Sequence, residues 1–412
     1  MTDLLIRRAR LWDAAHDAPL VSIMIRGGSI ESIEVERSDE KNARAGSESG
    51  RNDRKPPREL DAAGRVLMPA FVDCHTHACW AGDRLDEWDR KQAGASYLEI
   101  LESGGGIMST VRSVRNASRE ELTEGLLARL GVMLREGTLA VEVKSGYGMS
   151  TGDELKMLRA IHDAGSRWPG TLVATACIGH AKDPDQSDFV RTTIDETLPA
   201  VHAEFPSVAI DAYCERGAWS LEETVELLDR ALELGHPVRV HADQFNSLGV
   251  IPWAVRREIL SVDHLEASTP EELSLLAESE TFGVMLPCSG LHVDQRYADG
   301  RSFLDHGGRL AIASNCNPGS APTSSIPLTV ALANRFNRIT AHEAILACTA
   351  NAAALLGLSD RGRIEPGLRA DLVVLRHADA RMLAYEFGGD PVECVVLGGE
   401  VVRESGGRGR GS

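Results

Sequence analysis

The sequence predicts an α/β fold, a parallel (β/α)₈ barrel of the TIM type joined to a small β-sandwich module built from both ends of the chain. Apolar runs typical of buried strands alternate with amphipathic helical segments through the middle of the chain, and several runs end in polar residues. Short strand-like segments with turn signals occupy both ends. A doubly wound sheet is the alternative, but no Gly-rich fingerprint follows the first strand.

The first part of the β-module is predicted over residues 1–65. Short strand patterns at 4–6, 21–25 and 29–35 are separated by turn residues. Residues 37–59 hold almost no large apolar side chain, so they cannot bury enough surface to offset the entropy of ordering. We therefore expect a mobile surface loop there.

The barrel is predicted over residues 66–362, where strand-like runs alternate with helical patterns such as 220–234 and 269–279. The expected strands lie at 66–74, 138–144, 171–175, 207–213, 237–241, 261–264, 282–286 and 309–314. Short strands return over residues 363–412, with the texture of the N-terminal segment, so both ends together predict one composite module.

Composition excludes several classes of function. The chain has 412 residues with 44 basic and 61 acidic side chains, and the formal charge of −17 disfavours nucleic acid or an anionic membrane as a partner. No apolar span of membrane length and no secretory signal pattern is visible. Eight scattered cysteines without a C-x-x-C pair indicate reduced, mostly buried thiols. A cytoplasmic protein is expected.

Two histidines, His75 and His77, end the apolar run that begins at residue 66. Side chains at i and i+2 of an extended segment point to the same face, and barrels carry their chemistry at the C-terminal ends of the strands. Neutral imidazole is a common ligand of zinc and iron. The pair therefore predicts two arms of a metal site; the alternative is that both histidines merely flank a turn.

Three more histidines, His180, His241 and His264, also follow apolar runs. A mononuclear catalytic site needs three protein ligands and an open position for water. We choose His75, His77 and His241 as these ligands. His180 and His264 are then available to polarise a substrate or to move a proton, and hydrogen-bonded structural histidines are the alternative.

Several stretches together resemble one family. The His-x-His element is common to many amidohydrolases, whereas GASY, GGGI and KSGYG in one chain are far more specific. The matching stretches are DCHTH (73–77), GASY (94–97), GGGIMSTVR (104–112), EVKSGYG (142–148), CERG (214–217), HADQ (241–244), DHL (263–265) and NPG (317–319). Over roughly residues 60–400 the chain resembles the imidazolonepropionase family of the amidohydrolase superfamily.

The resemblance implies hydrolytic opening of the ring amide of 4-imidazolone-5-propanoate to N-formimino-L-glutamate in histidine degradation, with one zinc or iron ion per subunit that activates water. It implies a small anionic substrate, and homodimers are frequent in the family. Arg84 would clamp the propanoate carboxylate, which its planar fork fits. The other substrate contacts that it implies are Tyr97, Tyr147, His180, Gln244, Asn317, Gly319 and Ser320.

One position departs from the family pattern. The family carries a metal-ligating Asp where this chain has Asn315, and that Asp is also expected to accept the proton of the attacking water. Asn315 can still offer a carbonyl oxygen to a metal, but it cannot act as a base. His264 is then the first candidate for the proton acceptor and His180 the second.

Other readings follow from the same residues. With Asn315 the protein could bind metal more weakly and turn over slowly, or bind substrate without catalysis. A different amidohydrolase, such as a heterocycle deaminase, is a further alternative, although Arg84 argues against it because most nucleobase deaminases have no carboxylate to clamp. Lys144 is interpreted as a structural or electrostatic residue.

Overall fold

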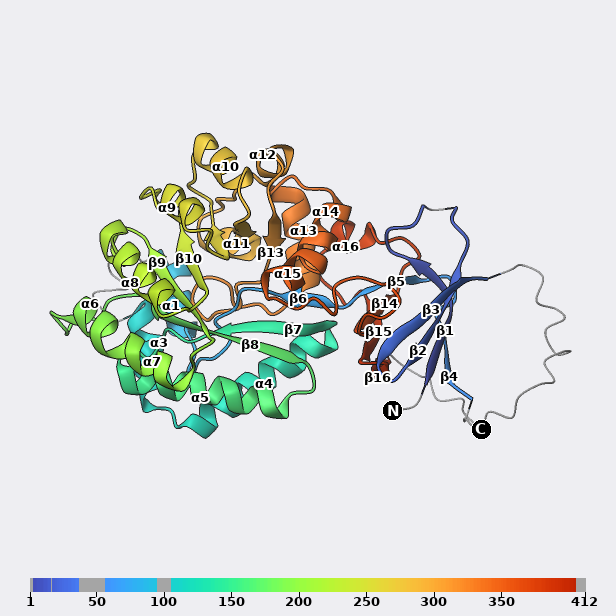
Figure 1. Ribbon diagram of the computed structural model, residues 1–412, viewed down its shortest axis with the longest axis horizontal. Helices are drawn as coiled ribbons and strands as arrows, with labels where there is room; N and C mark the ends of the chain where they lie inside the picture. The colour runs from blue at the N-terminus through green and yellow to red at the C-terminus, as the bar shows by residue number, and fades with distance from the viewer. Residues whose placement is uncertain (1–2, 16, 37–55, 95–104, 405–412) are drawn as a thin grey trace, which may run out of the picture.

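Two eight-stranded β-sheets organise the chain. The computed structural model describes residues 3–15, 17–36, 56–94 and 105–404. The first sheet is parallel and surrounded by helices, and the second is formed by the two ends of the chain, which lie together on the right of Figure 1. The predicted fold class is confirmed.

The parallel sheet forms the barrel, and each of its strands pairs with the next one along the chain. Its strands are β6 (Phe71–Asp73), β7 (Thr138–Lys144), β8 (Thr171–Gly179), β9 (Ala209–Cys214), β10 (Val238–Ala242), β11 (Ser261–His264), β12 (Phe282–Met285) and β13 (Leu310–Ile312). Among the described residues no ladder joins β13 to β6. Just beyond these strands, however, the Asn315 N–H donates to the His75 carbonyl (3.1 Å) and the His77 N–H donates to the Cys316 carbonyl (3.0 Å). These bonds close the ring where candidate site residues lie.

Helices cover the outside of the barrel and several begin with a capping box. They are α1 (Leu85–Gln92), α3 (Ile107–Asn116), α4 (Arg119–Arg135), α5 (Thr151–Arg167), α6 (Phe189–Thr192), the π-helical η1 (Thr193–Thr197), α7 (Leu198–Glu204), α8 (Leu221–Glu233), α9 (Ile251–Arg256), α10 (Pro270–Ala277), α11 (Pro287–Val293), α12 (Gly300–Asp305), α13 (Ile326–Phe336), α14 (Ala341–Ala347) and α15 (Ala350–Leu355). Ser220 and Thr269 cap α8 and α10 in reciprocal pairs with Glu223 and Glu272, which fixes the starts of both predicted helices.

The second sheet has the order β16-β15-β14-β5-β1-β2-β3, with β4 also paired to β1. Its strands are β1 (Leu4–Leu11), β2 (Val21–Arg26), β3 (Ser29–Val35), β4 (Arg58–Asp61), β5 (Val66–Pro69), β14 (Leu372–Leu375), β15 (Val392–Leu397) and β16 (Glu400–Glu404), and α16 (Met382–Tyr385) lies between β14 and β15. The β1–β2 register shifts between Ile6 and Ala9, where Arg8 has a φ of 52°. Strands from both ends of the chain share one apolar core.

Two expectations about boundaries were wrong. The run that begins at Val66 is two strands, because β5 pairs within the terminal sheet and only β6 belongs to the barrel. Pro69, which has no N–H to donate to a ladder, lies at the break. The predicted loop 37–59 ends too late, since β4 starts at Arg58 and pairs with β1. Its residues 37–55 lie outside the described part of the chain.

Strand β5 also joins the two cores. Val66 and Met68 pack into the barrel core, whereas Leu67 between them packs into the core of the terminal sheet, as the two-residue period of a strand requires. Strand β5 therefore belongs to the terminal sheet but contributes buried side chains to both cores.

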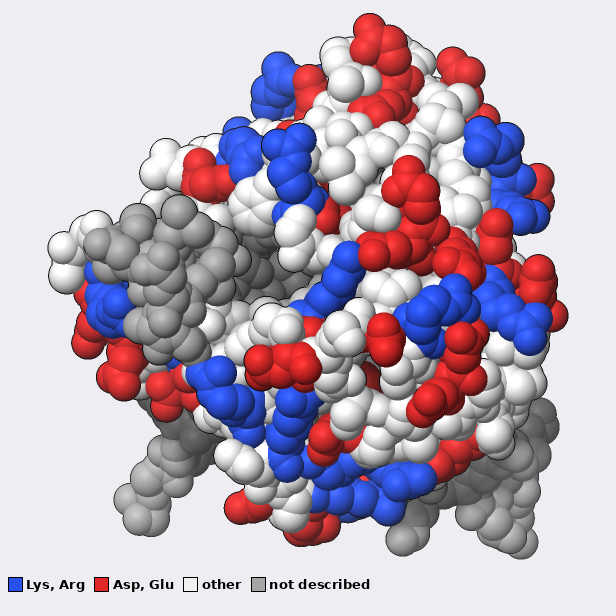
Figure 2. Space-filling model, turned by 90° about the vertical axis from the view of Figure 1, so that its left-hand side faces the viewer, with Lys and Arg blue, Asp and Glu red and all other residues white. Residues whose placement is uncertain are grey.

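The surface carries charges of both signs. On the end of the barrel that faces the viewer in Figure 2, acidic and basic side chains are interspersed rather than gathered into one field. All eight cysteines are buried free thiols. Among the described residues, none of the helices combines the length and apolar character needed to cross a bilayer.

Candidate active site

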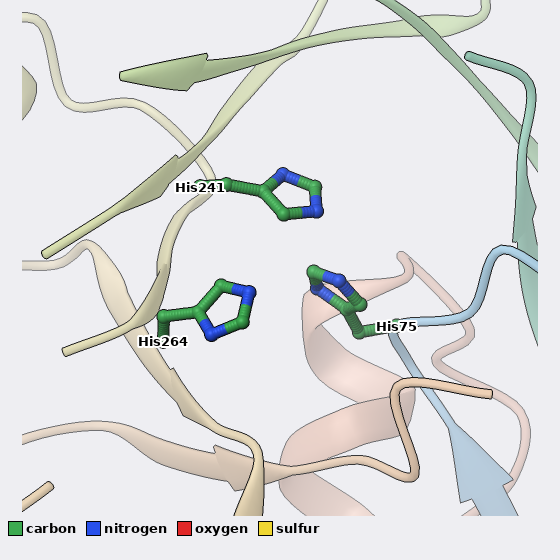
Figure 3. Close-up of side chains that lie close together, drawn as sticks. All are labelled: His75, His241 and His264. Carbon is green, nitrogen blue, oxygen red and sulfur yellow. The ribbon is translucent and has the colours of Figure 1, made fainter. Parts of the chain in front are cut away.

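Three imidazoles meet at one end of the barrel. His75 follows β6, His241 lies in β10 and His264 ends β11, and their rings point toward a common space (Figure 3). One ring nitrogen from each lies within 4.8 Å of the others, and all three side chains are buried. The positions follow from the pattern seen in the sequence, since parallel strands end at the same edge of a barrel.

Two carboxylates fix the proton positions on two of these rings. Asp263 Oδ2 lies 2.6 Å from His75 Nδ1, and Asp211 Oδ1 lies 3.0 Å from His241 Nδ1. A carboxylate accepts, so each Nδ1 carries the hydrogen and each Nε2 presents a lone pair. His75 Nε2 is buried and has no hydrogen-bond partner among the described residues. This carboxylate–histidine arrangement is typical of metal ligands.

Burial keeps the rings neutral, as metal ligands must be. It lowers the pKa of His75 and His77 well below the usual value, and it lowers the pKa of His241 despite the opposing effect of Asp211. His77 Nε2 lies 3.0 Å from His241 Nε2. The second histidine of the His-x-His pair therefore also lies beside the proposed metal ligands. The buried His77 Nδ1 lacks a partner among the described residues.

Asn315 completes the set of possible ligands. Its Oδ1 is buried and makes no hydrogen bond to any described residue, and its φ of 54° is unusual for a side chain other than glycine. Three or four imidazole nitrogens and one amide oxygen form a donor set that fits zinc or iron. The residues present therefore fit a divalent metal ion.

A network of buried charges supports these ligands from below. Lys144 Nζ donates to Glu142 Oε1 (2.6 Å) and Asp211 Oδ2 (2.8 Å). Arg239 Nη2 donates to Asp263 Oδ2 (2.7 Å) and Nη1 lies 3.3 Å from Glu142 Oε1. Burial disfavours a charged Lys144, yet the neighbouring carboxylates raise its pKa above the usual value. The electrostatic interpretation of Lys144 agrees with these contacts.

Sequence reasoning did not single out Glu142, Asp211 or Arg239. A signal was present, because each is a charged side chain inside a mostly apolar strand, Glu142 in β7, which also ends in Lys144, Asp211 in β9 and Arg239 in β10. Charges in strands that are covered on both faces must find partners inside the barrel. All three are buried.

His264 and His180 each have Nδ1 next to an oxygen acceptor. His264 Nδ1 lies 3.3 Å from Glu266 Oε1, and His180 Nδ1 lies 3.1 Å from the Gly146 carbonyl. These acceptors place the hydrogen on Nδ1 and leave Nε2 able to take a proton. Burial lowers the pKa of His180 to about 3. The His264 backbone has a φ of 94°, a costly conformation held by the surrounding structure.

The structure brings several predicted substrate contacts together. Tyr147 lies with its ring centroid 5.2 Å from that of His180. Gln244 Oε1 accepts a hydrogen bond from the Tyr213 hydroxyl (2.7 Å), and the Tyr213 ring lies 6.0 Å from His241. Sequence reasoning missed Tyr213, although it ends the predicted strand 207–213. Tyr97 lies outside the described residues.

The loop after β13 is ordered by its own side chains. Asn317 Oδ1 accepts from the N–H groups of Gly319 (2.8 Å) and Ser320 (2.7 Å), and its Nδ2 donates to the Asn315 carbonyl (2.6 Å). Asn317 thus uses its polar atoms to shape the loop that holds Asn315. An added Cβ on Gly319 would lie 3.3 Å from Arg84 Nη1, so a glycine there lets the guanidinium approach this loop.

Comparison with known proteins identifies the family of this chain. The amidohydrolase family model matches residues 66–402. The chain is 42% identical over 360 residues to the imidazolonepropionase of Herpetosiphon aurantiacus, with 84% of each chain covered. It is 43% identical over 339 residues to that of Deinococcus radiodurans, covering 82% of this chain and 84% of the relative. The chain belongs to the imidazolonepropionase family of amidohydrolases. It is a metal-dependent hydrolase of carbon–nitrogen bonds, as predicted.

Solved structures of two deaminases share the fold of this chain. A 5-methylcytosine deaminase from Klebsiella pneumoniae superposes with a TM-score of 0.75 at 17% identity, covering 99% of this chain and all (100%) of that one. An adenosine deaminase from Xanthomonas campestris with bound zinc gives 0.64 at 19% identity, covering 97% and 92%. At such identities the likeness concerns the fold alone.

Proposed function

We propose that this protein hydrolyses 4-imidazolone-5-propanoate to N-formimino-L-glutamate, the ring-opening reaction of histidine degradation. The observation that carries the proposal is the pair His75 and His241, whose carboxylate partners leave both Nε2 atoms facing one buried space in a member of the imidazolonepropionase family. Arg84 beside the loop that holds Asn315 supplies the cation for an anionic substrate.

His75, His77, His241 and the amide oxygen of Asn315 would hold one zinc or iron ion. Such an ion lowers the pKa of a water molecule and polarises a carbonyl group. Imidazole binds both metals, so the metal content of the purified protein decides between zinc and iron.

Side chains of this protein carry out the remaining steps. Arg84 binds the propanoate carboxylate, and Tyr147 and His180 pack against the ring. His264 Nε2 accepts a proton from the attacking water, because Asn315 has no basic oxygen. The ring amide C–N bond breaks as His264 returns the proton to the departing nitrogen. The former carbonyl carbon becomes a carboxylic acid, which releases the second proton of the water to solvent as it ionises.

The small anionic imidazolone is the proposed partner, and a homodimer is the proposed assembly, following the family resemblance. The proposed location is the cytoplasm, which the buried free thiols support.

The test is steady-state hydrolysis of 4-imidazolone-5-propanoate by metal-reconstituted protein, beside Asn315→Asp and His264→Asn. Turnover that His264→Asn abolishes supports the proposed reaction and acceptor. Binding without turnover, restored by Asn315→Asp, would instead identify a substrate-binding relative, the second candidate that Asn315 suggests. Inert proteins with metal bound would reject the substrate, and ammonia release from another heterocycle would indicate a deaminase.

A further inference from the structure

Arg84 is already paired in this structure. Its Nε donates to Glu87 Oε2 (2.7 Å) and its Nη2 donates to Glu87 Oε1, so one carboxylate takes both atoms along one edge of the guanidinium. Glu87 Oε2 also accepts the Gly106 N–H (2.8 Å), the N-cap of α3. The side chains of Arg84 and Glu87 are 13% and 23% exposed, so water screens this pair only in part.

Among the residues that the structure describes, no carboxylate pairs with the other edge of Arg84. A guanidinium has two edges that fit a carboxylate, Nε with Nη2 and Nη1 with Nη2. Glu87 occupies the first. Nη1 lies 3.4 Å from Thr110 Oγ1, a long contact, and next to the glycine at position 319. This second edge therefore faces the loop that holds Asn315.

We propose that Glu87 is the positioning residue that aims the second edge of Arg84 at the carboxylate of the substrate. The inference rests on the proposed function, in which Arg84 binds that carboxylate. An arginine side chain that is already held loses less rotamer freedom when it binds, so its ligand binds more tightly. The Gly106 bond extends this support, because it ties the α1 carboxylate to the start of α3.

A competing role for Glu87 predicts the opposite change in the affinity for carboxylate ligands. If its carboxylate merely occupied Arg84 until the substrate displaced it, removal of Glu87 would strengthen binding of carboxylate ligands. If Glu87 positions Arg84, its removal must weaken the binding of carboxylate ligands. A replacement side chain that keeps part of the contacts must then restore part of the affinity.

The experiment compares two probes by calorimetry with the metal-loaded protein, 3-(imidazol-4-yl)propanoate and the uncharged 4-propylimidazole. The ratio of their affinities isolates the contribution of the carboxylate. We expect Glu87→Ala to lower this ratio about tenfold, Glu87→Gln to lower it less, and 4-propylimidazole binding to stay within twofold. Asp86→Asn, on an exposed neighbour in the first turn of α1, is the matched control and leaves the ratio unchanged.

Arg84→Ala tests whether Glu87 acts on the ligand carboxylate through Arg84. It should remove the preference for the carboxylate probe, and adding Glu87→Ala should then change nothing further. An unchanged or higher ratio in Glu87→Ala overturns the inference, as does a ratio that Arg84→Ala leaves intact. Probe binding does not depend on turnover, so a protein that fails to hydrolyse the imidazolone but shows this pattern rejects only the proposed reaction.

Discussion

Asp263 Oδ2 accepts hydrogen bonds from two partners at once, His75 Nδ1 at 2.6 Å and Arg239 Nη2 at 2.7 Å. One oxygen thus links a candidate metal ligand to the buried charges beneath the site. Any rotation of the carboxylate would disturb both the imidazole and the guanidinium. The orientation of His75 is therefore set by the interior of the barrel and not by its own loop.

Asp263→Asn should weaken metal binding by 10- to 100-fold, because the amide cannot serve the ring and the guanidinium with equal strength. Competition with a chromogenic chelator measures this directly. Asp305→Asn, which alters the ion pair of an exposed carboxylate on α12 with Arg301, is the control and should leave metal affinity unchanged. Equal affinities for Asp263→Asn and the parent protein would contradict the orienting role.

The third imidazole ligand can be decided by metal content. His77→Asn should lose metal in the same way as His75→Asn, whereas His264→Asn should retain metal and lose turnover. The rival outcome has a structural basis, since His264 lies within 4.8 Å of both His75 and His241. Loss of metal from His264→Asn but not from His77→Asn would exchange the two roles.

Asn315→Asp should tighten metal binding at least about tenfold, because an anionic oxygen replaces a neutral one beside a divalent ion. The new carboxylate also offers a second proton acceptor. His264→Asn should therefore cost about 10²- to 10⁴-fold in kcat in the parent chain and clearly less in the Asn315→Asp background. Equal losses in both backgrounds would show that the carboxylate does not take over the proton.

Lys144→Met should destabilise the protein by about 3–5 kcal/mol, because it removes the buried cation that Glu142 and Asp211 share. Urea unfolding of the metal-free protein measures the change. Lys182→Met breaks a partly exposed pair with Glu223 and should cost no more than about 1 kcal/mol. Similar losses for both variants would mean that the buried network contributes little.

Metal-free protein should lose stability as the pH falls below neutrality. His180 is neutral when folded, with its pKa lowered to about 3, whereas the unfolded ring binds a proton below about pH 6.5. The unfolded state then carries the extra proton, so His180 alone lowers the free energy of unfolding by up to about 1.4 kcal/mol per pH unit on acidification. His180→Asn should flatten this slope between pH 7 and pH 5. The exposed His162 on α5 provides the control, and equal slopes for parent and His180→Asn would contradict the assignment.

The sequence was sufficient to predict the barrel because its strands are apolar runs with polar ends. It predicted which histidines would meet, since strand order and direction fix their positions. Periodicity alone could not show that residues 66–73 form two strands, because both segments are buried and only Pro69 marks the break. Nor could it show the Arg84–Glu87 pair, which depends on side-chain rotamers at the start of a short helix. Tertiary contacts decide such features.

Strand β5 has a consequence for how this enzyme can be divided. Its alternate side chains fill two cores, and only Ala70 separates it from β6, which leads to His75 and His77. A fragment trimmed to the barrel alone would expose the face that contains Leu67 and would release the chain just ahead of the metal-binding segment. We therefore expect the isolated barrel to bind the metal ion more weakly, even though it retains every proposed ligand. The terminal sheet therefore anchors the segment that carries the proposed metal ligands.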